Sequence, residues 1–190
     1  MIALITGASS GIGKEMAKNL ATRGVNLILV ARRTERLLAL KEEIVYNCPE
    51  IKVKTITADL SKEDQCFELY DRVKEYKIDF LFNNAGFGLY GPFLETDLKD
   101  ELSMINVNIK AVHILTKLFL RDFAARNSGY ILNTASVAGF MAGPLLATYY
   151  ATKNYVVQLT KAVYEELRST GSRVVTVSYT HLRAHETEAD

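Results

Sequence analysis

A tyrosine and a lysine lie four residues apart in the second half of the chain, at Tyr149 and Lys153. On a helix, residues at this spacing share one face, so the lysine ammonium can approach the tyrosine hydroxyl. A free tyrosine has a pKa of about 10, and a nearby positive charge favours its phenolate. The pair is therefore a candidate for general acid–base chemistry. Tyr150 would point about 100° away from that face.

A glycine-rich segment near the N-terminus has the composition of a phosphate-binding turn. It reads Thr6-Gly7-Ala8-Ser9-Ser10-Gly11-Ile12-Gly13 and lies between an apolar run and a helical pattern. Gly7 permits a tight turn, Gly11 lets the backbone approach a pyrophosphate, and Gly13 lets helix and strand pack closely. The following helix start offers unpaired N–H groups and a positive dipole end.

Two other interpretations of this turn remain. The stretch Gly7 to Gly11 formally matches the G-x-S-x-G nucleophile elbow of hydrolases, which needs an acid and then a histidine downstream. The only histidine before residue 178 is His113, on the apolar stripe of an expected helix. A glycine turn that binds nothing is the second alternative, so the other motifs must decide.

Short apolar runs alternate with amphipathic helical patterns from end to end, as in a parallel sheet with both faces covered. We expect one α/β domain, a doubly wound Rossmann-type sheet in a three-layer α/β/α arrangement, over residues 1–177. The expected strands are 2–5, 27–30, 53–56, 80–82, 130–133 and 174–177. Long helices are expected over residues 101–126 and 149–168.

The turn spacing T-G-x-x-x-G-x-G resembles the fingerprint of the classical short-chain dehydrogenases/reductases. Asn83-Asn84-Ala85-Gly86 resembles that family's N-N-A-G motif, and Tyr149 with Lys153 its Y-x-x-x-K motif. These motifs follow in family order, and the resemblance reaches about residue 177. It implies an NAD(P)-dependent oxidoreductase that transfers hydride between a nicotinamide and a carbonyl or alcohol.

The resemblance also implies a role for each catalytic candidate. Tyr149 would donate the proton and Lys153 would favour its phenolate, together with the positive nicotinamide of the oxidised cofactor. Ser136 would hold the carbonyl oxygen. Asn108 would carry a water-linked proton relay to the lysine, with Asn106 the weaker candidate. For the cofactor the implied contacts are Gly7, Ser9, Ser10, Gly11, Ile12, Gly13, Arg32, Arg33, Asp59, Leu60, Asn84, Ala85, Gly86, Tyr149 and Lys153.

Cofactor choice should depend on the end of the second strand, where NAD-specific relatives place an acid. Here Ala31 is followed by Arg32 and Arg33. A guanidinium pairs with a 2′-phosphate that a carboxylate would repel, so NADP(H) is favoured over NAD(H). Arg32 is the preferred candidate, because Arg33 could instead be a solvated charge at the start of the next helix.

The balance of charged residues makes some classes of binding partner unfavourable. With 23 basic and 22 acidic residues and 48% hydrophobic content, the chain has no strong field for nucleic acid or anionic lipid. No membrane span, signal peptide or metal site is expected, and Cys48 and Cys66 are interpreted as incidental reduced thiols in polar surroundings. We expect a cytoplasmic enzyme, with a homodimer or homotetramer implied by the resemblance.

Residues 178–190 depart from the family pattern, which continues with a Pro-Gly turn, a substrate-covering segment and a seventh strand. The segment holds His181 and His185 but neither proline nor glycine. We expect it to be foreign to the fold, and the chain as given to be weakly active or inactive.

An apolar substrate is suggested by residues near the expected cleft, although these could equally be core: Phe87, Leu89, Tyr90, Phe93, Leu145 and Leu146. A nucleotide-sensing module without chemistry is the rival from another class. Such a module would have a broken Ser-Tyr-Lys set, and here the set is intact.

Overall fold

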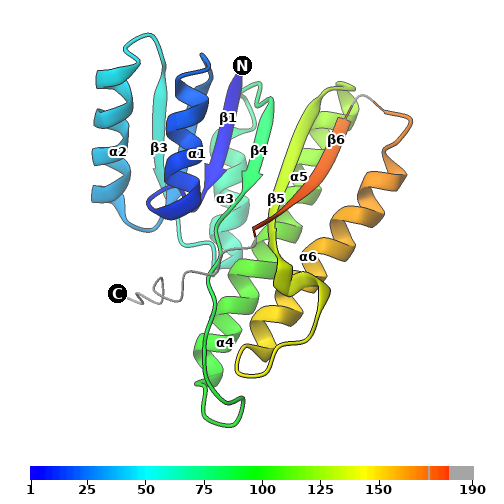
Figure 1. Ribbon diagram of the computed structural model, residues 1–190. Helices are drawn as coiled ribbons and strands as arrows, with labels where there is room; N and C mark the ends of the chain where they lie inside the picture. The colour runs from blue at the N-terminus through cyan, green and yellow to red at the C-terminus, as the bar shows by residue number, and fades with distance from the viewer. Residues whose placement is uncertain (171, 180–190) are drawn as a thin grey trace.

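Six parallel strands form one sheet in the computed structural model, which describes residues 1–170 and 172–179 (Figure 1). The strand order is β3-β2-β1-β4-β5-β6, the order of a Rossmann sheet. The chain direction of the crossovers reverses between β1 and β4, and ligands bind outside the carboxyl ends of the strands at such a point. The strands are β1 Ile2–Thr6, β2 Asn26–Ala31, β3 Val53–Thr57, β4 Phe80–Asn83, β5 Gly129–Ser136 and β6 Ser172–Tyr179.

Helices join the strands and cover both faces of the sheet. They are α1 Gly11–Ala21, α2 Thr34–Asn47, α3 Glu63–Val73, α4 Leu98–Ile105, α5 Val112–Ala125 and α6 Ala147–Glu166. Two further helical segments of other types are present: a π-helical segment at Asn106–Ala111, between α4 and α5, and a 3-10 turn at Val137–Phe140, after β5.

Successive strand residues point to opposite faces, and each set is buried under different helices. Leu4, Val30 and Ile131 pack with apolar residues of α3 and α5. Ala3 and Leu29 pack with apolar residues of α1 and α2. Each face thus has its own core, and the predicted three-layer α/β/α fold is confirmed.

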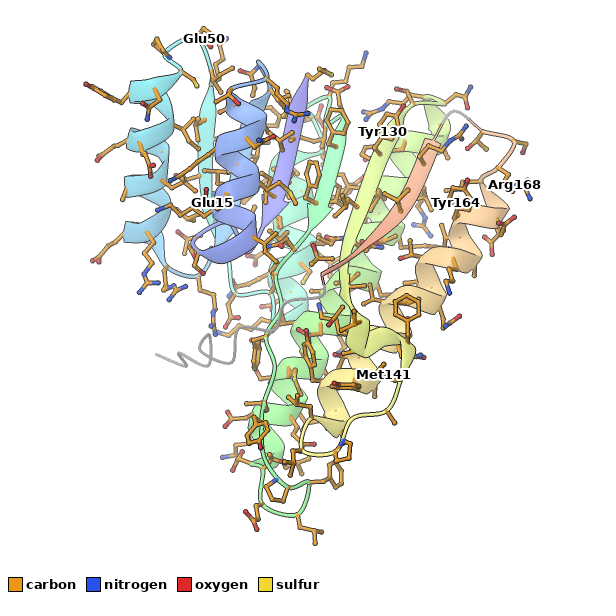
Figure 2. All side chains as sticks on the ribbon, in the orientation of Figure 1. Glu15, Glu50, Tyr130, Met141, Tyr164 and Arg168 are labelled. Carbon is orange, nitrogen blue, oxygen red and sulfur yellow. The ribbon has the colours of Figure 1, made fainter. Side chains whose placement is uncertain are left out.

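The half of the sheet around β4 to β6 is more open on the α1 and α2 side. Phe80 stacks on Tyr130 with ring centroids 5.5 Å apart, and Tyr130 remains half exposed there (Figure 2). Val175 of β6 is also exposed. In the part of the chain that the structure describes, β6 is the edge strand next to β5.

The structure corrects three details of the sequence analysis. The expected helix over residues 101–126 is interrupted by the π-helical segment, because the backbone there gains an extra residue per turn. Cys48 and Cys66 are buried in the two cores rather than in polar surroundings, because each lies on the inner side of its element. Strand β6 continues to Tyr179, which pairs with Ser136.

The remaining residues of the segment 178–190, among them His181 and His185, lie outside the described residues, so their expected foreign character stays a prediction. Within residues 1–170 and 172–179, every helix is too short or too polar to span a bilayer.

Candidate active site

The glycine turn between β1 and α1 is packed too closely to accept side chains at two positions. Gly7 has a φ of +65°, and a Cβ on it would lie 2.8 Å from the Cα of Ala85. A Cβ on Gly13 would lie 2.6 Å from the Asn84 side-chain nitrogen and would also strike the Gly7 carbonyl. The turn is therefore held against the segment after β4.

The N-terminus of α1 is suited to bind an anion. Ser10 occupies the N-cap position, yet its side chain caps no helix N–H, and the first turn of α1 holds no acidic residue. The orphan N–H groups and the helix dipole are thus left available for a phosphate. These features fit the dinucleotide that the sequence predicts.

An arginine adds positive charge to this turn. The Arg33 guanidinium donates a hydrogen bond from Nη2 to Oγ of Ser10 at 3.0 Å. Arg32, which the sequence analysis preferred, is exposed to solvent. The contact with the glycine turn is therefore made by the residue ranked second, because Arg33 lies at the N-cap of α2 and faces α1.

The Asn83-Asn84-Ala85-Gly86 segment is fastened to the end of β1. The backbone N–H groups of Asn84 and Ala85 both donate to Oγ1 of Thr6, each at 3.0 Å. The Asn84 side chain contacts the Gly7 carbonyl and accepts a hydrogen bond from Thr134. The segment thus joins β1, β4 and β5 at their carboxyl ends, directly under the glycine turn.

The predicted adenine contacts lie at the end of β3. Oδ1 of Asp59 accepts hydrogen bonds from the Ser61 hydroxyl at 2.8 Å and from its N–H at 3.1 Å. The Leu60 side chain is buried in the α3 and α5 core, so only its backbone can face a cofactor. Ile12 instead exposes its side chain beside the glycine turn.

Helix α6 brings Tyr149 and Lys153 to one buried face, as their spacing predicts. The Lys153 ammonium donates to the Thr134 carbonyl of β5 at 2.9 Å and lies 5.8 Å from the centroid of the Tyr149 ring. Tyr150 turns away and packs on Gly143, where a Cβ would strike its ring. Helical periodicity therefore places Tyr149, and not Tyr150, on the same face of α6 as Lys153.

Burial shifts both titratable groups. It lowers the pKa of the Lys153 ammonium to about 8, since a buried cation is poorly solvated. It raises the pKa of the Tyr149 hydroxyl, and hydrogen bonding with the Ser136 hydroxyl opposes that rise. The loss of solvation on burial thus outweighs the stabilisation of the phenolate by the Ser136 hydroxyl. The help that the sequence analysis expects from the positive nicotinamide of an oxidised cofactor stays a prediction.

Asn108 lies in the π-helical segment and is almost fully buried. Its amide group donates to the Phe87 carbonyl at 2.9 Å and to Oγ1 of Thr152 at 3.1 Å, and it accepts from the Phe87 N–H. A Cβ on Gly86 would lie 3.0 Å from Oδ1 of Asn108 and 3.4 Å from the Lys153 ammonium, so the two groups lie on the same side of Gly86. The neighbouring Asn106 makes no such contacts. Sequence reasoning missed Thr152, which shares a face of α6 with Tyr149.

Ser136 ends β5 and begins the 3-10 turn, where its Oγ accepts from the Ala138 N–H at 3.2 Å. The turn is fixed to α6, because the Asn154 side chain donates to the Gly139 carbonyl at 2.9 Å. A Cβ on Gly139 would lie 2.7 Å from Val157, so the turn and the helix are in close contact. These contacts set the position of Ser136 relative to Tyr149.

A buried polar network lies beneath the site, and sequence reasoning missed it. Asn83 donates to Oδ1 of Asn133 at 2.9 Å and to Oγ1 of Thr116 at 3.1 Å, and Asn133 donates to Oγ1 of Thr160 at 2.9 Å. The network joins β4 and β5 to α5 and α6. The signal that could have revealed it is an asparagine in each of two otherwise apolar strands, Asn83 in β4 and Asn133 in β5.

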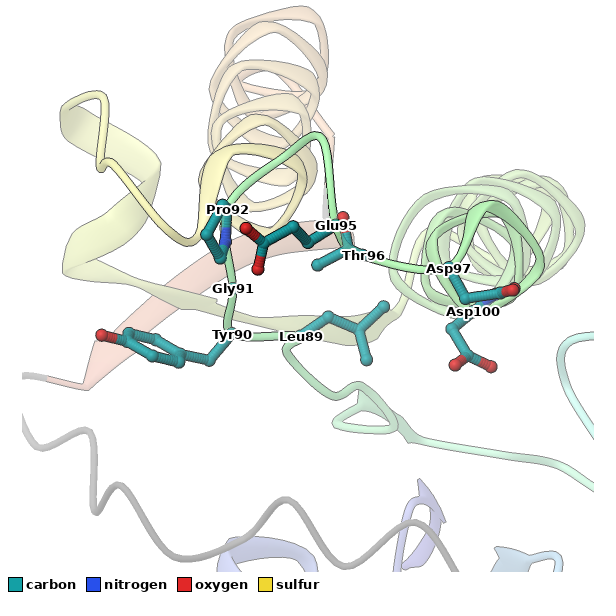
Figure 3. Close-up of a pocket in the computed structure, with 8 residues that line it drawn as sticks. All are labelled: Leu89, Tyr90, Gly91, Pro92, Glu95, Thr96, Asp97 and Asp100. Atoms are coloured by element: carbon teal, nitrogen blue, oxygen red, sulfur yellow. The ribbon is translucent and has the colours of Figure 1, made fainter.

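A pocket of about 310 Å³ lies beside the site, between residues 89–92 and the start of α4 (Figure 3). Leu89 and Tyr90 line it on one side, and Glu95, Asp97 and Asp100 also contribute to its wall. Leu89, Phe87 and Leu146 pack in the same apolar cluster as Tyr149, whereas Phe93 and Leu145 are more exposed.

The amino-acid sequence matches a family model described as short chain dehydrogenase over residues 1–189. The chain belongs to this family. It is 37% identical over 182 residues to a very-long-chain 3-oxoacyl-CoA reductase of Neurospora crassa, covering 93% of this chain and 55% of that protein. The chain thus spans about half the length of that relative.

Solved structures agree with the family assignment. A bulky-bulky ketone specific alcohol dehydrogenase from Comamonas testosteroni superposes with a TM-score of 0.91 at 33% identity, covering 97% of this chain and 74% of that one. A short-chain dehydrogenase from Sphingobium yanoikuyae in complex with NADPH has a TM-score of 0.88 at 33% identity, with coverages of 95% and 71%. A family member from Burkholderia phymatum in complex with NAD has a TM-score of 0.86 at 31% identity, with coverages of 93% and 64%.

Proposed function

We propose that this protein is an NADP(H)-dependent oxidoreductase that interconverts a ketone and an alcohol, with Tyr149 as proton donor in the reductive direction. The observation that carries the proposal is the gathering of Ser136, Tyr149, Lys153 and Asn108 at the carboxyl ends of the strands, beside a glycine turn suited to a dinucleotide. When bound, the nicotinamide supplies or accepts the hydride.

The side chains have distinct tasks in this proposal. Ser136 orients the substrate oxygen toward the Tyr149 hydroxyl, which donates its proton as negative charge develops on that oxygen. Lys153 has a pKa lowered to about 8, so it can exchange a proton with the site near neutral pH. Asn108 holds the segment after β4 in place and connects it to Thr152.

For the cofactor, we favour NADP(H) because the glycine turn carries a guanidinium and the end of β2 carries no acid. Arg33 is bound to Ser10, and Arg32 lies next to it in solvent. The two arginines could bind a 2′-phosphate together. The NADPH complex from Sphingobium yanoikuyae supports this choice, whereas the NAD complex from Burkholderia phymatum makes a direct comparison of the two cofactors necessary.

For the substrate, we favour an uncharged ketone with apolar substituents. Leu89 packs in the cluster of Tyr149 and lines the pocket together with Tyr90, and the name of the Comamonas testosteroni relative indicates a similar substrate. A 3-oxoacyl-CoA is the second candidate, on the name of the Neurospora crassa relative. The acids Glu95, Asp97 and Asp100 in the pocket wall disfavour it, because a coenzyme A ester carries several phosphate charges.

The test is the reduction of two substrates, a neutral aryl alkyl ketone and a 3-oxoacyl-CoA. Each reaction is measured by the loss of NADPH absorbance. We expect turnover of the neutral ketone and its loss in Tyr149→Phe. Turnover of the acyl-CoA alone would favour the second candidate, and full activity of Tyr149→Phe would contradict the proposed chemistry.

We also propose a homodimer or homotetramer built on the helices of residues 98–125 and 147–166. Leu98 and Leu102 of α4 and Tyr164 of α6 are exposed apolar side chains on these helices. Sedimentation at micromolar concentration tests this, and a monomer would contradict it.

A further inference from the structure

Glu101 of α4 has a carboxylate side chain that is buried next to α6, the helix of Tyr149 and Lys153. Only 8% of the residue is exposed. In residues 1–170 and 172–179, the ion pairs of the structure involve other acids, and no lysine or arginine neutralises Glu101. A buried charge without a cation is costly, so it needs other groups that stabilise it.

Two threonine hydroxyls supply hydrogen bonds to this carboxylate. The Thr96 hydroxyl donates to Oε1, and the Thr148 hydroxyl donates to Oε2 at 3.1 Å. Thr96 ends the segment that follows β4, whereas Thr148 directly precedes Tyr149 in the first turn of α6. One carboxylate therefore connects that segment to the residue beside the proton donor.

The start of α6 lacks the usual stabilising groups of a helix N-terminus. Leu146 occupies the N-cap position and provides no side-chain cap, and the first turn contains no acidic residue. The Leu146 N–H donates to the Gly143 carbonyl at 3.3 Å, but no side chain of α6 itself caps the following N–H groups or complements the positive end of this 20-residue helix. Glu101 brings a negative charge to this turn from a different helix.

The same two segments meet at further points around Tyr149. The Gly91 N–H donates to the Leu145 carbonyl at 2.8 Å, and Leu145 has a left-handed φ of +66°. Such a conformation persists in a leucine only where the surroundings hold it. Gly88 lies against the Tyr149 ring, because a Cβ there would be 3.2 Å from it. A shift between the two segments would thus move Tyr149 relative to Ser136.

We propose that Glu101 is a positioning residue for Tyr149. Its carboxylate fastens the segment after β4 to the first turn of α6 and complements the positive end of that helix. This role rests on the proposed function of Tyr149 as proton donor, but the contact itself exists whether or not that function holds.

The first test needs no turnover: hydrogen–deuterium exchange of the amides whose hydrogen bonds close the start of α6, beginning with the Tyr150 N–H that donates to the Leu146 carbonyl. Glu101→Ala should speed their exchange about tenfold, since capping contacts stabilise a helix end by an amount of this order. Amides of β1 and β2 should be unchanged, which verifies that the variant is folded. Glu101→Gln keeps the shape and one acceptor without the charge, so we expect an intermediate effect. Glu95→Ala, an exposed acid of the same segment, is the matched control for this measurement and should leave these exchange rates unchanged.

If Glu101→Ala does not fold, Glu101→Gln decides alone, with exchange several-fold faster than in the unmodified chain. Unchanged exchange in the folded variant would overturn the proposal, and so would an equal increase in Glu95→Ala.

The second test is a double-mutant cycle on carbonyl reduction with Glu101→Ala and Thr148→Val. Each change should lower kcat about tenfold while leaving the Kd for NADPH within about twofold, because misplacement affects the reacting geometry and not the glycine turn. The double variant should be no slower than the slower single variant. Additive losses, or an unchanged kcat in Glu101→Ala, would overturn the proposal. If the proposed function is wrong, Tyr149→Phe keeps full activity. In that case the exchange experiment alone tests the role of Glu101.

Discussion

The Lys153 ammonium donates a hydrogen bond to the Thr134 carbonyl, two residues before Ser136 on the same strand. This bond ties α6 to β5 at the level of the site, so the tyrosine of the helix and the serine of the strand keep a constant relative position. It also leaves a lysine inside the protein with little solvation.

The stability of the protein should depend on pH through Lys153. Its pKa is about 8 in the folded state against an ordinary value of 10.5, so the unfolded chain binds more protons between these values. The free energy of unfolding should therefore rise with pH across this window, by up to about 3 kcal/mol, whereas below it the full burial penalty is present. Urea unfolding from about pH 7 to 10 measures this. In Lys153→Met the rise should be absent, and the exposed control Lys99→Met should retain it. Parallel curves for all three proteins would contradict the lowered pKa.

Tyr149 and Tyr150 should respond differently to loss of the hydroxyl. Tyr149→Phe should lower kcat for ketone reduction by about a hundredfold to ten-thousandfold, the usual contribution of a general acid. Tyr150→Phe should retain activity, because its ring packs on Gly143 and its hydroxyl has no role at the site. NADPH binding, followed by fluorescence, should survive both changes. Loss of activity only in Tyr150→Phe would show that the proton donor has been misassigned.

Cofactor preference should depend more on Arg33 than on Arg32, because Arg33 already contacts the glycine turn. A charged hydrogen-bonded pair is worth about 1.5–3 kcal/mol, so Arg33→Ala should raise the KM for NADPH by about tenfold or more. The KM for NADH should stay the same, and Arg32→Ala should have the smaller effect. Equal use of NADPH and NADH by the unmodified protein would contradict the NADP(H) preference. A larger effect from Arg32→Ala would restore the sequence-based ranking.

Gly13→Ala should separate cofactor binding from general destabilisation. Its Cβ would meet the Asn84 amide and the Gly7 carbonyl, so the turn must open and NADPH binding should be lost. Gly24→Ala is the matched control: it has a positive φ of +78° but open space around it, so it should cost about 1 kcal/mol of stability without affecting binding. Calorimetric titration with NADPH measures the difference. Normal binding by Gly13→Ala would contradict the assignment of this turn.

Local patterns predicted much of the fold and the composition of the candidate site. Strands 2–5 and 27–30 were predictable because apolar residues bounded by turn residues form strands in a parallel sheet. The distinction between Tyr149 and Tyr150 followed from helical periodicity alone. The glycine turn was predictable for the same kind of reason, since strand, turn and helix are consecutive in the chain.

Contacts between distant parts of the chain were decided by the tertiary structure. Arg33 and Ser10 are 23 residues apart, and only the packing of α2 beside α1 brings them together. Asn108 appeared to lie in a regular helix, but the π-helical segment and its bonds to Phe87 and Thr152 set its orientation. Glu101 falls at the start of the helix expected over residues 101–126, and it is buried because α4 packs on the start of α6. Hydrophobic periodicity specifies which face of an element is covered, but not which element covers it, so the partners of buried polar groups emerge only when the sheet and its helices assemble.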